Sequence, residues 1–132
     1  MNSNKTPRAS IIITNYNGQD LLKKYLPSII REVDTSLGHE IIVVDDGSYD
    51  KSREIIKHYL VTLVEQPNQG VATARNTGIA RSTGDYFISI DADDELEPDY
   101  IGKTLKLMQG DVQVVYTDLQ FIGNQQGVVN MP

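Results

Sequence analysis

The feature that most constrains the fold is a regular alternation of short apolar runs with longer segments of helical character. The runs are "SIIIT" (10–14), "EIIVVD" (40–45), "VTLVEQ" (61–66), "DYFISI" (85–90) and "VQVVYT" (112–117). Most of their residues are β-branched or otherwise apolar, with few of the alternating polar positions that mark a strand with one solvated face. These runs therefore predict strands of a mostly parallel sheet that is covered on both faces.

Helices are expected between the runs, over residues 21–33, 51–60, 71–82 and 98–110. In the first of these, apolar residues recur every three or four positions, as in an amphipathic helix, and Pro27 should kink or split it. In the third, Gly78 lies in the middle, where glycine is unfavourable. Because strands and helices alternate, the sequence predicts an α/β fold with a Rossmann-like sheet flanked by helices.

The two ends of the chain differ from this pattern. Residues 1–9 form a polar lead, and the segment "LQFIGNQQGVV" near the other end predicts a hairpin around residues 123–127. Residues 10–132 have the length and pattern of a single domain. No signal-peptide core and no membrane-length apolar run is found, so we expect a cytoplasmic location, or a membrane-peripheral one in a longer form of the protein.

Composition excludes several classes of function. The net charge of −6 disfavours binding to nucleic acid, and the absence of cysteine excludes disulfides, thiolate catalysis and cysteine-ligated metals. His39 and His58 lack the spacing of metal ligands, and we expect both at the surface. A phosphate-bearing ligand would therefore need local positive charge.

Polar clusters follow three of the predicted strands: "TNYN" (14–17), "DDGS" (45–48) and "DADD" (91–94). In parallel α/β sheets, ligands bind beyond the carboxyl ends of the strands. The three clusters should therefore meet at one edge of the sheet and form a binding site.

The third cluster suits a metal ion. Asp91 and Asp93 are two positions apart, so their carboxylates project from the same side if the backbone is extended. Oxygen ligands without histidine favour Mg²⁺ or Mn²⁺, and such an ion allows acidic residues to bind a diphosphate. The other acidic residues are expected near the start of the following helix, where its dipole favours them: Asp94, Glu95, Glu97 and Asp99.

Asp45 and Asp46 leave two interpretations open. They can form a local turn, or accept hydrogen bonds from a ribose or a base. A nicotinamide-binding domain is excluded because the first strand is followed by "TNYNGQD" and lacks the glycines of that fold. Arg75 can reach a pyrophosphate, or pair with one of the aspartates.

The ordered set "SIIITNYNGQDLLKKYLPSI", "EIIVVDDGSYDKS", "NQGVATARNTGIARSTGDYFISIDADDELEPDYI" and "VVYTD" resembles the N-terminal, donor-binding half of a family 2 glycosyltransferase with the GT-A fold. The resemblance implies transfer of a sugar from a nucleotide-diphosphate donor, usually a UDP-sugar, to an acceptor hydroxyl with inversion. It also implies a divalent cofactor, Mn²⁺ or Mg²⁺. Residues 10–132 would be part of such a domain.

The resemblance assigns roles to residues of this chain. The residues implied in donor binding are Thr14, Tyr16, Asp45, Asp46, Arg75, Asp91 and Ala92, and those implied in metal binding are Asp91 and Asp93, the two aspartates of a D-x-D motif. Tyr16 would lie beside the base and Asp46 would contact base or ribose. The catalytic base and the acceptor site of the family are expected beyond the last residue of this chain, so the isolated chain is expected to be weak or inactive. Asp118 stays unassigned.

Two other functions remain open. A phosphoryl-transfer α/β domain also gathers aspartates and Mg²⁺ at strand ends, although this chain lacks the first-strand motif or the lysine that such domains need. A nucleotide-binding module without catalysis would bind UDP but turn over no donor. We also expect an exposed apolar face where the rest of the family's fold would pack, and self-association through it.

Overall fold

The computed structural model describes residues 6–123 and 127–131. The chain divides into two compact units, one ending at Pro98 and the other beginning at Asp99. The first unit contains a four-stranded sheet with its helices, and the second contains one α-helix and a two-stranded hairpin. The candidate site described below lies entirely in the first unit.

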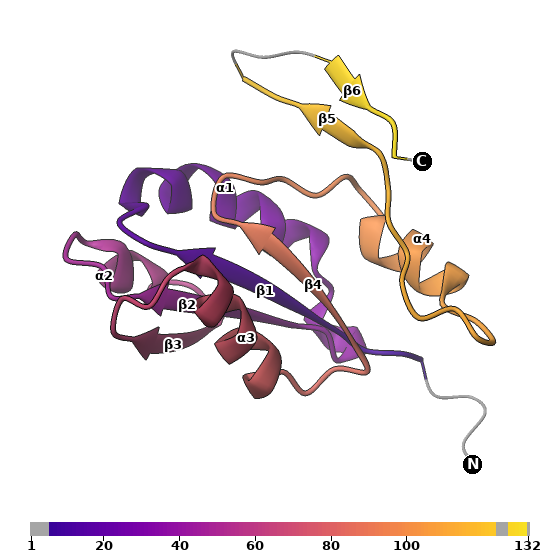
Figure 1. Ribbon diagram of the computed structural model, residues 1–132, viewed down its shortest axis with the longest axis horizontal. Helices are drawn as coiled ribbons and strands as arrows, with labels where there is room; N and C mark the ends of the chain where they lie inside the picture. The colour runs from indigo at the N-terminus through magenta and orange to yellow at the C-terminus, as the bar shows by residue number, and fades with distance from the viewer. Residues whose placement is uncertain (1–5, 124–126, 132) are drawn as a thin grey trace. The chain divides into compact units, whose positions relative to one another are not determined.

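The sheet of the first unit is parallel throughout and has the strand order β3-β2-β1-β4 (Figure 1). Its strands are β1 (Ala9–Asn15), β2 (Glu40–Asp46), β3 (Thr62–Gln66) and β4 (Tyr86–Asp91). The predicted parallel α/β sheet is confirmed, and each of its four strands lies within a residue or two of the expected range.

Strand β1 is the centre of this sheet. It pairs with β2 on one side and β4 on the other, and all seven of its residues are buried. Ile11, Ile12 and Ile13 have no exposed surface, which explains why the run is continuously apolar: helices cover both faces of the strand.

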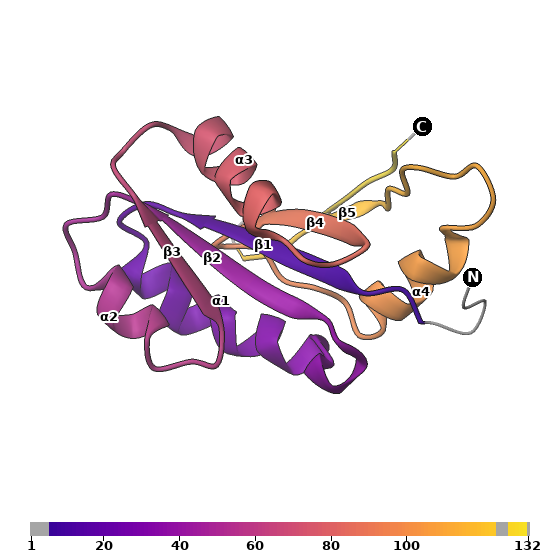
Figure 2. The same ribbon diagram turned by 90° about the horizontal axis from the view of Figure 1, so that it is seen from below.

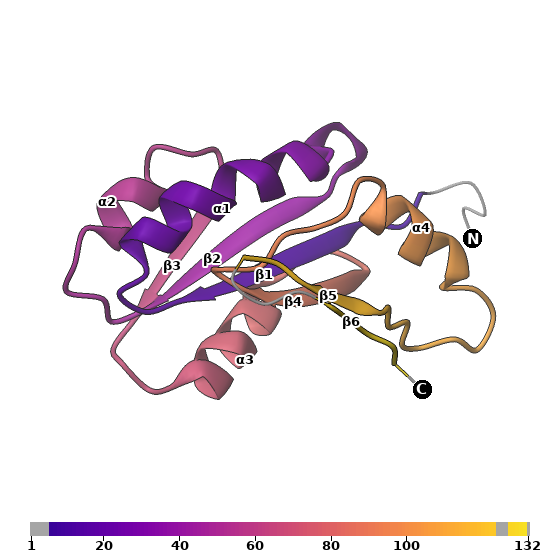
Figure 3. The same ribbon diagram turned by 90° about the horizontal axis from the view of Figure 1, so that it is seen from above.

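Helices α1 (Gln19–Glu32) and α2 (Ser52–Ile56) cover one face of the sheet, and α3 (Val71–Arg81) covers the other (Figures 2 and 3). A short 3₁₀ helix, η1 (Thr35–Leu37), follows α1. The expected helix over 51–60 is shorter than predicted, since α2 ends at Ile56. In the described residues no helix is long and apolar enough to cross a membrane.

Pro27 does not split α1, so the split, one of the two predicted effects of the proline, is not found. The helix runs through it without interruption, with Leu22, Tyr25, Leu26 and Ile29 buried on both sides of the proline. Packing of this apolar stripe keeps the segment helical, although the proline removes one backbone hydrogen bond.

Close packing against the sheet explains why a glycine, Gly78, lies in the middle of α3. A Cβ atom at this position would lie 2.4 Å from Cγ2 of Ile12 and 3.2 Å from Cγ2 of Val44. The helix therefore approaches the sheet closely here, and only glycine fits between α3 and the two strands.

The structure differs from the prediction at residues 112–117 and at His39. Residues 112–117 form no strand, because β-branched residues form a strand only where a neighbouring strand pairs with them. His39 is buried rather than exposed, and its Nδ1 accepts a hydrogen bond of 2.9 Å from the backbone N–H of Ala9. His58 is exposed as expected.

The second unit contains α4 (Tyr100–Leu107) and the strands β5 (Leu119–Phe121) and β6 (Gly127–Val129). The two strands pair antiparallel, which confirms the predicted hairpin, although residues 124–126 of its turn lie outside the described residues. The first turn of α4 holds no acidic residue. Asp99 is the N-cap residue of α4, so the expected position near the helix start is confirmed for Asp99, whereas Asp94, Glu95 and Glu97 precede the helix.

Replacing Gly78 by alanine should destabilise the first unit by about 1–3 kcal/mol, because the added methyl group overpacks the contact with Ile12. Alanine normally favours a helix, so the sign of the effect tests the packing argument. Urea unfolding measures it, with the exposed Asn76→Ala in the same helix as the control. Equal stability of Gly78→Ala and the wild type would contradict the close approach.

Candidate functional site

A cleft of about 530 Å³ opens at the carboxyl ends of β1, β2 and β4. Its lining comes from the segments that follow these strands and from the loop between β3 and α3. The lining residues are Thr14, Asn15, Tyr16, Gly18, Leu21, Asp46, Asn68, Gly70, Val71, Ala74, Asp91, Ala92 and Asp93. The three polar clusters therefore meet at one edge.

Most of the residues singled out in the sequence line this cleft: Thr14, Tyr16, Asp46, Asp91, Ala92 and Asp93. Asp45 and Arg75 do not line it. The register of the sheet explains the convergence, since Thr14 of β1 lies opposite Asp91 of β4 and Asn15 lies opposite Asp45 of β2.

Asp46 holds the loop that leads into α3. Its Oδ1 accepts hydrogen bonds from Gln66 Nε2 (2.9 Å) and from the Gln69 N–H (2.8 Å), and its Oδ2 accepts one from the Gly70 N–H (3.0 Å). The side chain is nevertheless at the cleft wall. Gly47 beside it has φ +80°, and a Cβ there would lie 2.6 Å from the backbone nitrogen of Asn68, so this turn requires glycine.

Asp45 points into the protein instead. It is 1% exposed, and its carboxylate accepts hydrogen bonds from Asn15 Nδ2 (3.1 Å) and from the Ser48 N–H (3.0 Å). Arg53 Nε lies 3.7 Å from its Oδ2. The carboxylate thus ties the ends of β1 and β2 together, and its geometry fits the local-turn interpretation.

The third cluster gathers three carboxylates. One oxygen from each of Asp91, Asp93 and Asp94 lies within 4.8 Å of the others, and all three residues are exposed. The backbone turns after Asp91, with the Asp94 N–H donating to the Asp91 carbonyl (3.1 Å) and the Asp91 N–H donating to Asp94 Oδ2 (2.8 Å). The expected extended geometry is therefore wrong, and it is a turn that brings these side chains together.

The electrostatics of this cluster are unfavourable for further negative charge. Partial burial raises the pKa of the Asp94 carboxyl; the hydrogen bond from the Asp91 N–H opposes this, and the negative charges of Asp91 and Asp93 add to it. A bound cation would relieve the repulsion among the three carboxylates. Their oxygen ligands suit a hard divalent ion.

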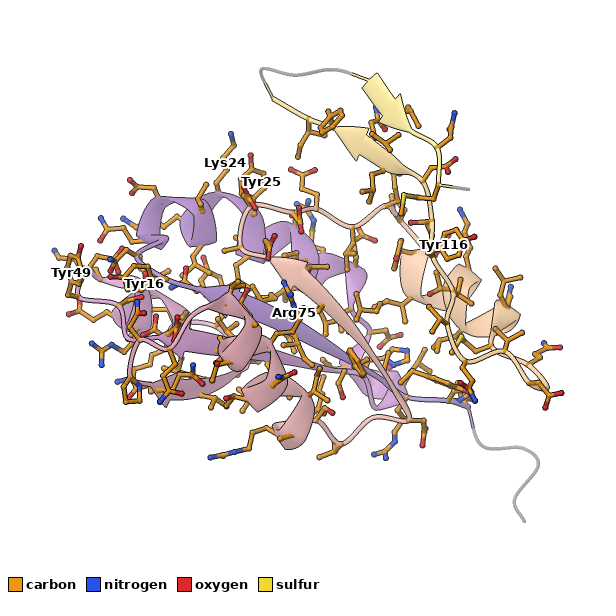
Figure 4. All side chains as sticks on the ribbon, in the orientation of Figure 1. Tyr16, Lys24, Tyr25, Tyr49, Arg75 and Tyr116 are labelled. Atoms are coloured by element: carbon orange, nitrogen blue, oxygen red, sulfur yellow. The ribbon has the colours of Figure 1, made fainter. Side chains whose placement is uncertain are left out.

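Arg75 brings a positive charge beside Asp91. It extends from α3 toward β4 (Figure 4), where its Nε donates to Ser89 Oγ (2.7 Å) and its Nη2 lies 3.7 Å from Asp91 Oδ1. The arginine thus pairs with an aspartate, one of the two interpretations from the sequence. Neither lysine nor arginine is among the described residues that line the cleft.

Asn68 and Gly70 of the cleft and Asp94 of the carboxylate cluster received no individual binding role from the sequence. Asn68 and Gly70 belong to "PNQG", which we interpreted only as a turn, and Asp94 was assigned to a helix start. Their signal was position, since each follows a strand whose end lies at this edge of the sheet or next to it.

The family model described as "Glycosyl transferase family 2" matches residues 10–130. The chain belongs to this family. It is 43% identical over 100 residues to the uncharacterized glycosyltransferase YibD of Escherichia coli, covering 72% of this chain and 28% of YibD. Glycosyltransferase GlyA of Streptococcus pneumoniae is 36% identical over 115 residues, which are 81% of this chain and 16% of GlyA. The chain thus spans less than a third of either relative.

Solved structures confirm the GT-A fold. The mannosyltransferase PcManGT from Pyrobaculum calidifontis, in complex with GDP-Man and Mn²⁺, superposes with a TM-score of 0.73 at 25% identity, covering 82% of this chain and 34% of that one. TarS of S. aureus (residues 1–349) superposes with a TM-score of 0.70 at 21% identity, covering 76% and 32%. Membership of a glycosyltransferase family argues against the alternative of a phosphoryl-transfer domain.

The substitution Asp46→Asn should destabilise the first unit by about 1–3 kcal/mol and loosen the loop before α3. An asparagine NH₂ in place of Oδ2 would face the Gly70 N–H, so two donors would meet without an acceptor. Urea unfolding and hydrogen exchange at the Gly70 amide measure the two effects. The exposed Glu65→Gln, with the same change of charge, is the control. Unchanged protection of that amide would contradict the prediction.

Proposed function

We propose that the cleft binds a nucleotide-diphosphate sugar and that this chain provides the donor and metal site of a glycosyltransferase. The observation that carries the proposal is the group of three carboxylates at a cleft that no basic side chain among the described residues lines. Two linked phosphates can enter such a cleft only together with a cation.

The donor set fits a divalent ion. Asp91, Asp93 and Asp94 offer oxygen ligands from an exposed turn, so side-chain rotations could bring these oxygens to the distance of about 2.0–2.1 Å that Mg²⁺ needs. A bound ion would neutralise the diphosphate and stabilise the charge that develops on it as the sugar leaves. The complex of PcManGT with GDP-Man and Mn²⁺, at 25% identity, supports a metal-dependent donor site.

The remaining lining residues suit the nucleoside. Tyr16 is 49% exposed and lines the cleft, so its ring is available for stacking against a base. Oδ2 of Asp46 receives one hydrogen bond and keeps a lone pair for a ribose hydroxyl or a base N–H. Thr14 offers a hydroxyl group for a hydrogen bond to the nucleoside. Asp45 is buried and contributes indirectly, because its hydrogen bonds with Asn15 and Ser48 fix the loops beside the cleft. We expect a UDP-sugar as the donor.

In the proposed reaction, the acceptor oxygen forms a bond to the anomeric carbon while the bond from that carbon to the diphosphate breaks, with inversion. The acceptor proton passes to a general base, which we assign to no residue of this chain. Arg75 beside Asp91 lies near enough to add positive charge at the diphosphate. The chain spans a fraction of its relatives, so transfer by the whole protein is also part of the proposal.

Binding of UDP should require a divalent ion. In the presence of Mn²⁺, the substitution Asp93→Asn should weaken UDP binding by about 10- to 100-fold, because it removes a charged ligand from the ion that bridges to the phosphates. Isothermal titration calorimetry with Mn²⁺ and with EDTA measures this, and GDP in parallel tests the choice of base.

The matched control is Glu97→Gln, which removes the same charge from an exposed position outside the carboxylate cluster. It should bind UDP as the wild type does. If wild-type affinity is the same in EDTA as in Mn²⁺, the metal-dependent site is ruled out.

Self-association is proposed through the hairpin. Leu119 lies opposite Val129, and Phe121 is two positions along the same strand, so the three apolar side chains share one face. All three are exposed. Light scattering should show a molar mass that rises with protein concentration, and Phe121→Ser should reduce the rise. Gln120→Ser, on the opposite face, should not; equal effects of both variants would rule out this face.

A further inference from the structure

Tyr16 has an aromatic neighbour outside the cleft. The ring of Tyr49 lies 6.2 Å from that of Tyr16, centroid to centroid, at an interplanar angle of 84°. Figure 4 shows the two side chains together at one end of the sheet. This is the edge-to-face arrangement that aromatic rings prefer, and it contributes beyond burial. Tyr49 itself does not line the cleft.

The backbone beneath this pair is firmly held. The Tyr49 N–H donates to Asn17 Oδ1 (2.9 Å), and the Asn17 N–H donates to Ser48 Oγ (2.9 Å). Ser48 is 1% exposed and donates in turn to the buried Asp45. The loop after β1 and the loop after β2 are thereby joined, and each carries one of the two tyrosines.

The side chain of Tyr49 contrasts with this anchored backbone. It is 83% exposed, so burial of its ring adds little to the stability of the fold. The ring contact with Tyr16 is the one interaction of this side chain among the described residues. The main consequence of this ring contact is therefore to restrict Tyr16, whose ring would otherwise rotate more freely beside the cleft.

We propose that Tyr49 is a positioning residue that holds the Tyr16 ring in the orientation that receives the nucleobase. The proposal rests on the function proposed above for the cleft. Holding the ring in advance lowers the entropy that must be lost when a base stacks on it, which increases affinity without any direct contact. Tyr49 would then strengthen binding of the nucleoside part of the donor and leave the diphosphate part unaffected.

The test compares two probes, UDP and inorganic pyrophosphate, each with Mg²⁺, by calorimetry on the full chain. Tyr49→Ala should weaken UDP binding by about 2- to 12-fold, the range expected for loss of an edge-to-face contact, and leave pyrophosphate binding unchanged. Tyr49→Phe keeps the ring and should bind UDP as the wild type does. Unchanged melting temperatures of both variants would show that the fold is intact.

A double-mutant cycle separates positioning from direct contact. If Tyr49 acts through Tyr16, then Tyr49→Ala should have no further effect on UDP binding in the Tyr16→Ala background. A loss of the same size in both backgrounds, an equal loss for pyrophosphate, or no loss at all would overturn the proposal. Wild-type protein that binds neither probe would overturn the proposed function as well, whereas wild-type binding of UDP with an unaffected Tyr49→Ala would overturn only the role of Tyr49.

Discussion

The arrangement of the site depends on the pairing of β1 with strands on both sides. Because β1 is buried and hydrogen-bonded to β2 and β4 in parallel, the three strands end at the same edge in a fixed register. A shift of one residue would turn Thr14 and Asp91 to opposite faces. The buried isoleucines of β1, Ile11 to Ile13, do not line the cleft, yet they fix the strand whose register decides which polar residues face each other.

The aspartates at this edge divide into two groups by their hydrogen bonds. Asp45 and Asp46 accept hydrogen bonds from backbone and side-chain donors, and so organise the loops that follow β2 and β3. Asp91, Asp93 and Asp94 are exposed and repel one another. Carboxylates that stabilise loops need no further partner, whereas a cluster of exposed ones gains from a cation. The metal site proposed here therefore uses the second group.

The sequence predicts this division only in part. Apolar runs predicted the sheet, and position after a strand predicted the edge, since both follow from local patterns. Which of Asp45 and Asp46 faces the cleft depends on donors from Asn15 and Gly70, which lie far away in the chain. The wrong predictions for residues 112–117 and for His39 have the same cause. Strand pairing and burial depend on segments that are distant in the chain, and a local sequence pattern does not contain that information.

The ion pair of Arg75 with Asp91 offsets part of the repulsion among the carboxylates at this edge. The guanidinium is 3.7 Å from Asp91, and the two side chains are 40% and 59% exposed, so the pair contributes about 1 kcal/mol or less. In the proposed donor complex, a divalent ion would interact more strongly with Asp91 than the guanidinium does, and would replace the guanidinium as the partner of this carboxylate. Ser89 holds Nε of the arginine at 2.7 Å, so the guanidinium would stay beside the site after that exchange, where an incoming diphosphate offers it a new partner.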